Sequence, residues 1–470
     1  MSAAADLTSA SVTELAALVG SRKVSALEVL DEHLQRIERV NPALNAIVRI
    51  DAERARDRAR RADAAMARGE SWGPLHGVPF TLKDMHEAAG FGASVGTRAS
   101  ESSPTSDGVV AERLQAAGAI LFGKTNMSNS LQTISEQFGR ASNPYDTSRT
   151  TGGSSKGAAA AIAARMTPFD VGTDLSGSIR MPSHFCGVFG LRPTMHRIPV
   201  AGMVFGPPGG PRMDRVLGAA GPMARTAADV DLLFRVLAGP HSRDTEVPPV
   251  PLADPRKVEV RGLRVAVAPS ITGTKTAREI RAALEKLASK LSDEGAIVEE
   301  REPCPFPELL SAFRRYFVVP ISMAIRAGIV PPGMVPAGLR AEDFPQPTPF
   351  DVATALDERD RCIEKVGRFF SNHDLFVCPA ATALAFPHCT PGSPVEIDGE
   401  PVPSLAVDHP TILSTFTASP SLVVPIAQSA GGLPIGAQLV GPRWHDERLL
   451  AIGAAVADMV GPLPPPADLG

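Results

Sequence analysis

Two glycine–serine turns contain the residues of this chain that are best suited to chemistry. They are Gly152-Gly153-Ser154-Ser155 and Gly177-Ser178, and a run of small residues typical of a packed helix lies between them. Glycine permits backbone angles that other residues rarely adopt, so successive N–H groups in such turns can converge on one anion. A single Gly-Ser pair is usually an ordinary turn. Two linked pairs, with Asp174 and Arg180 beside the second, predict a serine nucleophile with an oxyanion site.

The serine needs a base within hydrogen-bonding reach, because its hydroxyl is a weak nucleophile at neutral pH. None of the ten histidines lies close to either turn in the sequence, and a histidine from a distant segment is left open. Residues 153–157, GSSKG, also match the G-x-S-x-G elbow of α/β-hydrolases, with Ser155 as the nucleophile. That elbow follows an apolar strand, whereas residues 142–151 are polar. The elbow is therefore the weaker alternative.

Residues 148–193 resemble the signature of the amidase signature family of serine hydrolases. The family pattern reads roughly GGSSGG, then a small-residue helix, then GTDxGGSIRxPxxxCGxxGLKPT. This chain reads GGSSKG at 152–157, GTDLSGSIR at 172–180, CG at 186–187 and GLRPT at 190–194. Further similar segments are GVPF at 77–80, TLKD at 81–84, GKTNM at 123–127, NPYD at 143–146 and GLPIG at 432–436. The resemblance covers most of residues 8–459.

The resemblance implies a Ser-cisSer-Lys triad. It places the nucleophile at Ser178, the cis serine at Ser154 and the base at Lys83. In the family, a neutral lysine accepts a proton that the nucleophile passes through the cis serine, and water then hydrolyses the acyl-enzyme. The other expected site residues are the backbone N–H groups of Leu175, Ser176, Gly177 and Ser178 as oxyanion donors, Ser155, Thr173, Asp174 and Arg180 as supporting residues, and Met127 and Leu131 in the substrate pocket.

Two residues beside this site depart from the family pattern. Lys156 replaces a usual glycine of the first motif, and Ser176 replaces the first glycine of GGSIR. Both flank the expected catalytic serines. A changed oxyanion loop or a changed substrate preference is therefore expected.

The implied activity is hydrolysis of amide C–N bonds, as in an aryl acylamidase or a urethanase, with carbamates and esters as further substrates. An apolar or aromatic small molecule is expected, because two proline-rich segments carry many flexible apolar side chains. Core packing or a subunit contact would use the same residues, which are Met203, Phe205, Met213, Phe313, Phe317, Met323 and Met334. A non-catalytic or transamidosome-type subunit is the competing class, and the joint presence of the three triad residues argues against it.

The bulk composition narrows the class of protein. The formal net charge is −4 with no long basic run, so nucleic acid is not an expected partner. No apolar run approaches the length that spans a membrane, and the N-terminus lacks a signal peptide, so a cytoplasmic monomer or homodimer is expected. The five cysteines are scattered without a CxxC pair, which favours reduced thiols and no metal site. No cofactor is expected.

The elements that must position these residues predict one large α/β domain over residues 1–460. The resemblance and the strand–helix–strand pattern of residues 78–122 predict a central twisted, mostly parallel mixed sheet covered by helices. The first of these strands, 78–82, is expected to be short and buried, with Lys83 at its end. Capping boxes at Ser11 and Ser25 predict two N-terminal helices, the second stopped at Asn41-Pro42. The signature core is expected at about 75–200, a loop at 199–224, and a variable pocket region at about 300–350. Residues 461–470 are expected to be a disordered tail.

Overall fold

A large mixed sheet forms the centre of the fold. The computed structural model describes residues 6–128, 131–204, 216–254, 258–328, 330 and 340–467. The strands of the sheet are β4 (Phe169–Asp174), β5 (Phe189–Arg192), β6 (Ala219–Ala224), β7 (Arg264–Val267), β8 (Ile297–Glu300), β9 (Leu375–Pro379), β12 (Ser421–Gln428) and β13 (Pro434–Val440). Within the described residues these eight strands are ordered β4-β6-β5-β12-β13-β9-β7-β8. The chain is a single α/β domain.

Antiparallel pairing dominates this sheet. All neighbours from β4 through β9 are antiparallel, and the parallel pairs are β7 with β9 and β7 with β8. The prediction of a mixed sheet is confirmed, but the prediction that it is mostly parallel is wrong. The strand–helix–strand pattern that suggested parallel pairing belongs to a different, smaller sheet. In the large sheet, short links such as the β12–β13 turn can join only antiparallel neighbours.

The smaller sheet carries Lys83. Its strands are β1 (Ile47–Ile50), β2 (Pro79–Lys83) and β3 (Ile120–Thr125), in the order β1-β3-β2. Strands β2 and β3 are parallel, and α4 (Val109–Ala116) lies between them in the sequence. Every residue of β2 is buried, so the expected buried strand that ends at Lys83 is confirmed. A separate hairpin pairs β10 (Val395–Ile397) with β11 (Glu400–Val402).

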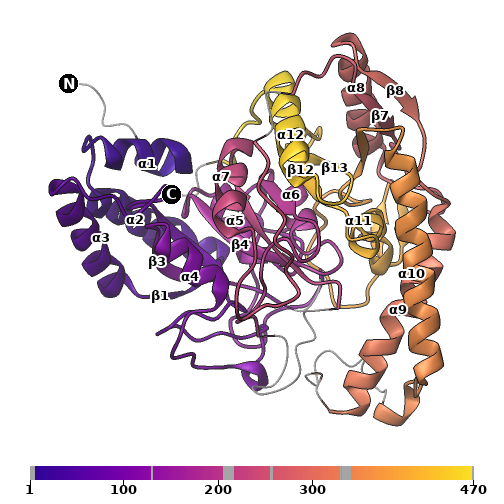
Figure 1. Cartoon of the computed structure of the whole chain (residues 1–470), viewed down its shortest axis with the longest axis horizontal. Coiled ribbons are helices and arrows are strands. Elements are labelled where there is room, and N and C mark those ends of the chain that lie inside the picture. Colours follow the sequence, from indigo (N-terminus) through magenta and orange to yellow (C-terminus); the bar gives the residue numbers. More distant parts are fainter. Residues whose placement is uncertain are drawn as a thin grey trace.

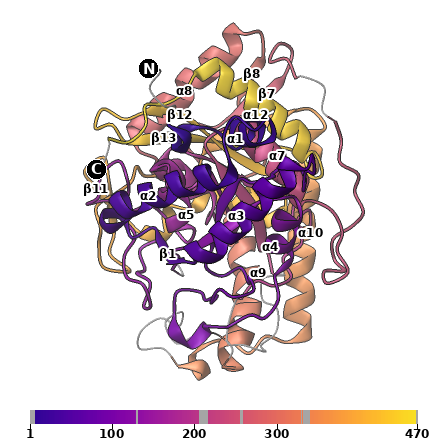
Figure 2. The ribbon, with the colours of Figure 1, turned by 90° about the vertical axis from the view of Figure 1, so that its left-hand side faces the viewer.

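Helices cover both ends of the molecule. The N-terminal helices lie at one end and a long pair, α9 and α10, lies at the other (Figure 1). Figure 2 shows α2 and α3 as an outer layer at the N-terminal end. No helix within the described ranges is both long enough and apolar enough to cross a bilayer. The helices are α1 (Val12–Gly20), α2 (Ala26–Leu44), α3 (Ala52–Ala67), α5 (Lys156–Ala163), α6 (Arg180–Cys186), α7 (Ala227–Leu237), α8 (Arg278–Asp293), α9 (Phe306–Arg326), α10 (Pro349–Phe370), α11 (Ile412–Phe416) and α12 (Asp446–Val460).

The first two helices begin as the sequence predicts. Ser11 and Ser25 each form a complete capping box, which supplies acceptors to N–H groups that the first helical turn leaves free. Helix α2 does not stop at Asn41-Pro42, and this prediction is wrong. Pro42 removes only one donor near the helix end, and the helix continues to Leu44, where the left-handed φ of 48° at Asn45 ends it.

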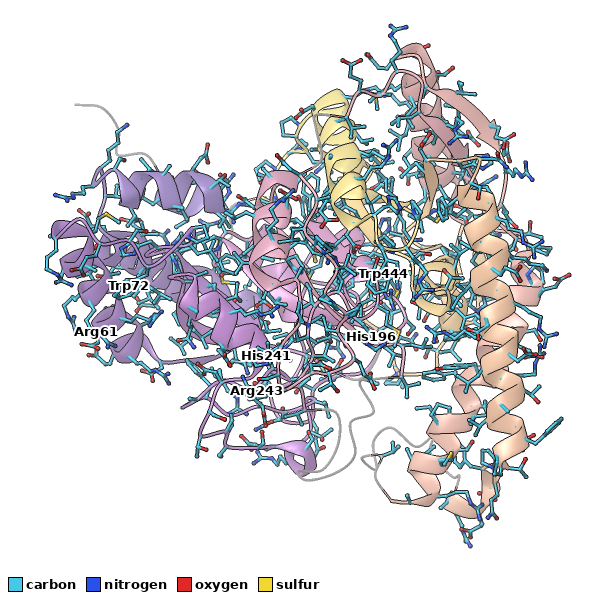
Figure 3. The ribbon with its side chains drawn as sticks, viewed as in Figure 1. Arg61, Trp72, His196, His241, Arg243 and Trp444 are labelled. Atoms are coloured by element: carbon cyan, nitrogen blue, oxygen red, sulfur yellow. The ribbon has the colours of Figure 1, made fainter. Side chains whose placement is uncertain are left out.

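Three segments without an expected helix or strand have the following structure. Residues 219–224, expected to be part of a loop, form strand β6. Phe205 and Met213, from the same expected loop, lie outside the described residues. The proline-rich segment after α7 is held to α4, because His241 and Arg243 both pair with Glu112. Figure 3 shows His241 and Arg243 near each other on this segment. Part of the expected disordered tail, 461–467, is described, and the Pro464 carbonyl accepts hydrogen bonds from the Tyr145 hydroxyl and the Gln428 amide.

Candidate active site

Three separate segments of the chain carry the expected triad residues: the end of a strand of the smaller sheet, the loop before α5 and the turn after a strand of the large sheet. Lys83 is the last residue of β2, Ser154 lies just before α5, and Ser178 follows β4. The two serine turns are joined directly, because the Ser155 N–H donates to the Ser178 carbonyl at 3.1 Å. Ser154 and Ser178 line the same cavity. The peptide bond between Gly153 and Ser154 is cis, as the family resemblance implies.

The Lys83 amine lies inside a ring of hydroxyl groups. Its Nζ is 2.7 Å from Ser154 Oγ, 2.9 Å from Ser155 Oγ and 2.7 Å from Thr173 Oγ1. The side chain is fully buried. A neutral amine in this place keeps a lone pair that can accept the hydroxyl proton of Ser154, while its two N–H groups donate to the other oxygens. The arrangement suits a base that acts through Ser154.

Burial sets the basicity of Lys83. It lowers the pKa of the amine from 10.5 to about 7, and the carboxylates of Asp174 and Asp170 act in the opposite direction. An ammonium loses most of its hydration in a buried site, so the protonation equilibrium shifts towards the neutral amine. Lys83 is therefore available as a neutral base near neutral pH.

Asp170 is a residue of this site that the sequence reasoning missed. It is fully buried in β4 and accepts the backbone N–H of Lys83 at 3.0 Å. It also accepts the hydroxyl protons of Thr81 at 2.8 Å and Thr125 at 3.0 Å. Burial raises the pKa of its carboxyl group to about 7, against the lowering effect of these hydroxyls. Asp170 thus ties β2 and β3 to β4, and its only sequence signal was an acid inside an apolar strand.

A buried ion pair shapes the turn that carries Ser178. Asp174 accepts the N–H groups of Gly177 at 2.8 Å and Ile179 at 3.0 Å. Arg180 donates to both oxygens of the same carboxylate, from Nη2 at 2.7 Å and Nε at 2.9 Å. Burial acts to raise the pKa of Asp174, but Arg180 and Arg192 hold it well below its usual range. Asp174 and Arg180 thus hold the turn that carries Ser178, and their supporting role in catalysis stays a prediction.

The same pair changes the expected set of oxyanion donors. The Gly177 N–H is directed at Asp174 and is not available to a substrate, so its inclusion among the donors is wrong. Within the described chain, no hydrogen bond uses the N–H groups of Leu175, Ser176 or Ser178. These three remain the candidate donors. The carboxylate of Asp174, three residues earlier, accepts the Gly177 N–H. The sequence does not record that contact, so it could not show that Gly177 differs from its neighbours as an oxyanion donor.

The departure at Ser176 adds a contact that glycine cannot make. The Ser176 side chain lies beside the carboxyl group of Asp408; burial raises the pKa of that carboxyl group to about 7, and Ser176 acts to lower it. Thr411 packs against Gly177, where an added Cβ would come within 2.8 Å of the threonine hydroxyl oxygen. The oxyanion loop is therefore packed against residues 408–411, and a side chain at position 177 would displace it.

The cavity beside the serines is mainly apolar. It has a volume of about 170 Å³. Of the two pocket residues expected, Met127 lines this cavity and Leu131 does not, because Leu131 lies in a second pocket beside Lys156. The other apolar lining residues are Met85, Val95, Leu175, Met203, Phe317 and Ile321.

The apolar residues singled out from the sequence therefore divide by location. Met203 and Phe317 line the cavity, Phe313 belongs to the core, and Met323 is 52% exposed. Phe205, Met213 and Met334 lie outside the described residues. Ile321 was missed, although it stands one helical turn after Phe317 on α9. That spacing places both side chains on one face of the helix.

The elbow alternative does not fit the geometry. No strand precedes Ser155 across residues 142–154, and its hydroxyl is fully buried against Lys83 and the Thr173 carbonyl. Within the described chain, no hydrogen bond joins a histidine to Ser154, Ser155 or Ser178. Nor do three histidine, cysteine or acidic side chains gather as a metal-ligand set in the part of the chain described. The site offers lysine–serine chemistry.

Comparison with known proteins agrees with this arrangement. The family model described as Amidase matches residues 28–329 and 345–450. The glutamyl-tRNA(Gln) amidotransferase subunits A of Acidothermus cellulolyticus and Cupriavidus necator are each 32% identical to the chain. The alignment with the Acidothermus cellulolyticus protein covers 96% of this chain and 94% of that one. The alignment with the Cupriavidus necator protein covers 94% of each chain.

Solved structures give the same family. A bacterial aryl acylamidase of the amidase signature enzymes superposes with a TM-score of 0.81 at 25% identity, covering 96% of both chains. A 6-aminohexanoate cyclic dimer hydrolase complexed with substrate superposes with a TM-score of 0.79 at 26% identity, covering 99% of this chain and all of that one. The family model spans most of the chain, and the two relatives align over at least 94% of each chain. The chain is therefore an enzyme of the amidase signature family.

Proposed function

We propose that the protein hydrolyses amide C–N bonds through an acyl-enzyme on Ser178. The observation that carries this proposal is the buried Lys83 amine 2.7 Å from the Ser154 hydroxyl, in the cavity that Ser178 also lines. Ser178 attacks the substrate carbonyl, its proton passes to Ser154, and the Ser154 proton passes to Lys83. Collapse of the tetrahedral intermediate expels the amine, which receives a proton back along the same path. Water then repeats the sequence and releases the acid.

The backbone supports the negative charge that develops on the carbonyl oxygen. The N–H groups of Leu175, Ser176 and Ser178 lie on a turn that Asp174 and Arg180 hold in place. A donor fixed before the reaction costs no reorganisation when the charge forms, and one such donor is worth ~10²–10³ in rate. The rigid turn is thus the second part of the proposed machinery.

The preferred substrate is an amide, anilide or carbamate with an apolar or aromatic group. Among the described lining residues, the only charged side chain is Asp174, which is already paired with Arg180. The flexible thioethers of Met85, Met127 and Met203 suit a variable apolar group. Because each buried methylene contributes ~0.8 kcal/mol, lengthening an acyl chain should raise kcat/KM about fourfold per carbon until the cavity is full.

The substrate preference is tested with p-nitroanilides of increasing acyl length, from acetyl to hexanoyl and benzoyl. We expect kcat/KM to rise along the series for the wild-type enzyme. Ile321→Ala should flatten the rise, because it removes apolar surface from the cavity wall. Val318→Ala, on the same helix but 45% exposed, is the matched control and should leave the series unchanged. Equal rates along the wild-type series would rule out an apolar pocket.

A second candidate is hydrolysis of glutamine to supply ammonia to a partner, as in an amidotransferase subunit. It is favoured by the 32% identity to glutamyl-tRNA(Gln) amidotransferase subunits A over 96% of this chain. Glutamine carries an α-carboxylate that calls for a cation, and the described lining residues of the cavity include no lysine or arginine. Adding glutamine to the substrate panel separates the two candidates, and kcat/KM above that of the best anilide would establish the second.

The activity should depend on pH through Lys83. The base must be neutral, and its pKa of about 7 places the rise of kcat/KM near neutral pH. Asp170→Asn removes a carboxyl group whose ionised form raises this pKa, so the acid limb should move to lower pH, by less than about one unit because Asp170 is itself only partly ionised near pH 7. The amide oxygen can still accept the Lys83 N–H, which keeps the strand in place. A pH profile of kcat/KM for both enzymes measures the shift, and superimposable limbs would show that Asp170 does not act on the base.

A further inference from the structure

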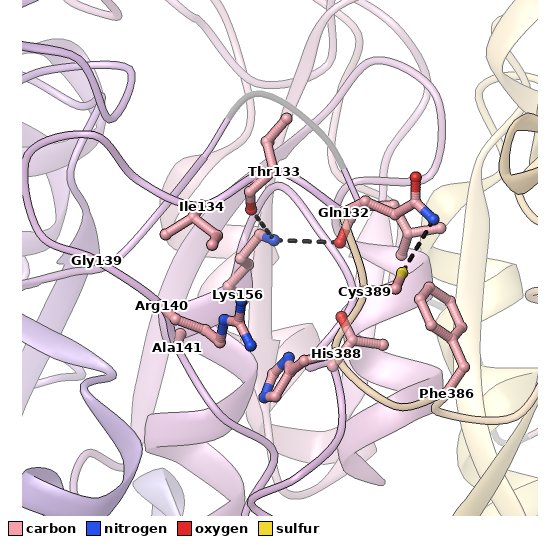
Figure 4. A pocket seen from close by; sticks show the side chains of 12 residues that line it. Gln132, Thr133, Ile134, Gly139, Arg140, Ala141, Lys156, Phe386, His388 and Cys389 are labelled. Carbon is pink, nitrogen blue, oxygen red and sulfur yellow. Dashed lines mark hydrogen bonds between the residues drawn. The ribbon is translucent and has the colours of Figure 1, made fainter. Parts of the chain in front are cut away.

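A second pocket lies beside the first turn of α5, apart from the cavity that the catalytic serines line (Figure 4). Its walls come from residues 131–141, from the start of α5 and from residues 386–389. The enclosed space is about 20 Å³. A cavity of that size has room for about one water molecule or one monatomic ion.

Lys156 is the buried charge of this pocket. Its side chain is only 7% exposed. Its Nζ donates to the Thr133 carbonyl at 2.7 Å and to the Leu131 carbonyl at 3.2 Å (Figure 4). An ammonium group has three N–H donors, so one remains beyond these two carbonyls. The pocket supplies the space for a partner to that donor.

Further basic groups face the same space, and no acid does. Arg140 and His388 line the same pocket, and Figure 4 shows them below the Lys156 amine. None of the lining residues that the structure describes is Asp or Glu. Burial lowers the pKa of Lys156 to about 7, Arg140 lowers it further, and the Cys389 thiol acts weakly against them. Burial, Arg140 and Lys156 lower the pKa of His388, and Asp146 acts in the opposite direction.

The ammonium group of Lys156 has no acidic partner among the described residues of this pocket. A buried cation is costly unless an opposite charge pairs with it, and here the other charged side chain among the described lining residues is the exposed guanidinium of Arg140. Among the described residues, no ion pair involves Lys156 or Arg140. Gln132 closes the wall, because its amide donates to the Ser393 carbonyl at 2.8 Å and to Cys389 Sγ at 3.2 Å. The pocket therefore has a wall held by hydrogen bonds and a buried amine with two carbonyl partners, no paired acid and one further donor.

We propose that this pocket is a binding site for a small inorganic anion of the size of chloride, paired with Lys156 and facing Arg140 and His388. Bulky carboxylates and phosphate exceed the enclosed space. The site does not depend on the proposed catalytic mechanism, because it uses none of the triad residues. It lies close to them, since Lys156 follows Ser154-Ser155 directly in the chain.

The test compares chloride with gluconate, which is too large for the pocket, at constant ionic strength. At pH 6.5, where Lys156 is largely charged, replacing gluconate by chloride should raise the Tm of the wild-type protein by about 2 °C. Lys156→Met should abolish the rise, and Lys286→Met, a change at an exposed lysine of α8, should retain it. Equal Tm values in the two salts, or the same rise in Lys156→Met, would overturn the proposal.

A second measurement does not require a stable variant. Crystals of the wild-type protein soaked in bromide should show an anomalous peak within hydrogen-bonding distance of Lys156 Nζ. Bromide peaks confined to other parts of the surface would contradict the proposal, even if chloride raised the Tm. Since neither readout uses turnover, failure here is distinct from failure of the proposed amidase activity.

Discussion

Ser178→Ala should reduce kcat for anilide hydrolysis by ~10⁴-fold or more, because it removes the attacking atom while the oxyanion turn and the cavity remain. The stability of the variant should change little, since the Ser178 side chain is only partly buried and its hydroxyl makes no hydrogen bond to any residue in the described ranges. Steady-state kinetics on the best p-nitroanilide measure the loss, and a thermal melt confirms that the variant is folded.

Covalent labelling identifies the nucleophile independently of the rate. A fluorophosphonate should add to Ser178 in the wild-type protein, and peptide mass spectrometry should locate the adduct on the fragment that contains Gly177-Ser178. Ser155 is the informative alternative, because it is the nucleophile of the elbow reading and lies 2.9 Å from Lys83 Nζ. An adduct on Ser155 would reverse the assignment of the nucleophile.

Lys83→Met should lower kcat/KM by the ~10²–10⁴-fold expected of a general base. Methionine approximates the length of lysine, fills the buried site and cannot accept a proton. It leaves three hydroxyls without their nitrogen partner, yet Ser155 keeps a contact with the Thr173 carbonyl at 3.3 Å. The pH profile supplies the second readout, since the rise near pH 7 should disappear with the base.

The control for Lys83 is another buried lysine with a lowered pKa. Burial lowers the pKa of Lys124 to about 8, and its amine donates to the carbonyls of Asp84 and His86, with no serine among its partners. Lys124→Met should cost stability while the folded enzyme keeps the pH dependence of the wild type. A folded Lys83→Met enzyme with near-normal turnover would contradict the mechanism.

Local patterns in the sequence predicted the pieces of the fold better than their assembly. The capping boxes at Ser11 and Ser25 and the buried strand before Lys83 were confirmed, because each depends on neighbours within a few residues. The direction of strand pairing was wrong, since it depends on which strands meet across the sheet. Strand β6 was taken for a loop because its Gly- and Ala-rich residues carry little of the usual strand signal.

By itself, the sequence determined the family and the residues with reactive side chains, because Ser154, Ser178 and Asp174 lie within one continuous motif. Only the tertiary structure decided what those residues touch. It placed the Lys83 amine 2.7 Å from a hydroxyl 71 positions away, and it buried that amine so that its pKa falls to about 7. It also directed the Gly177 N–H to Asp174 and brought Ile321 to the cavity. Desolvation and contact between distant segments arise from packing of the whole chain, and no local pattern records them.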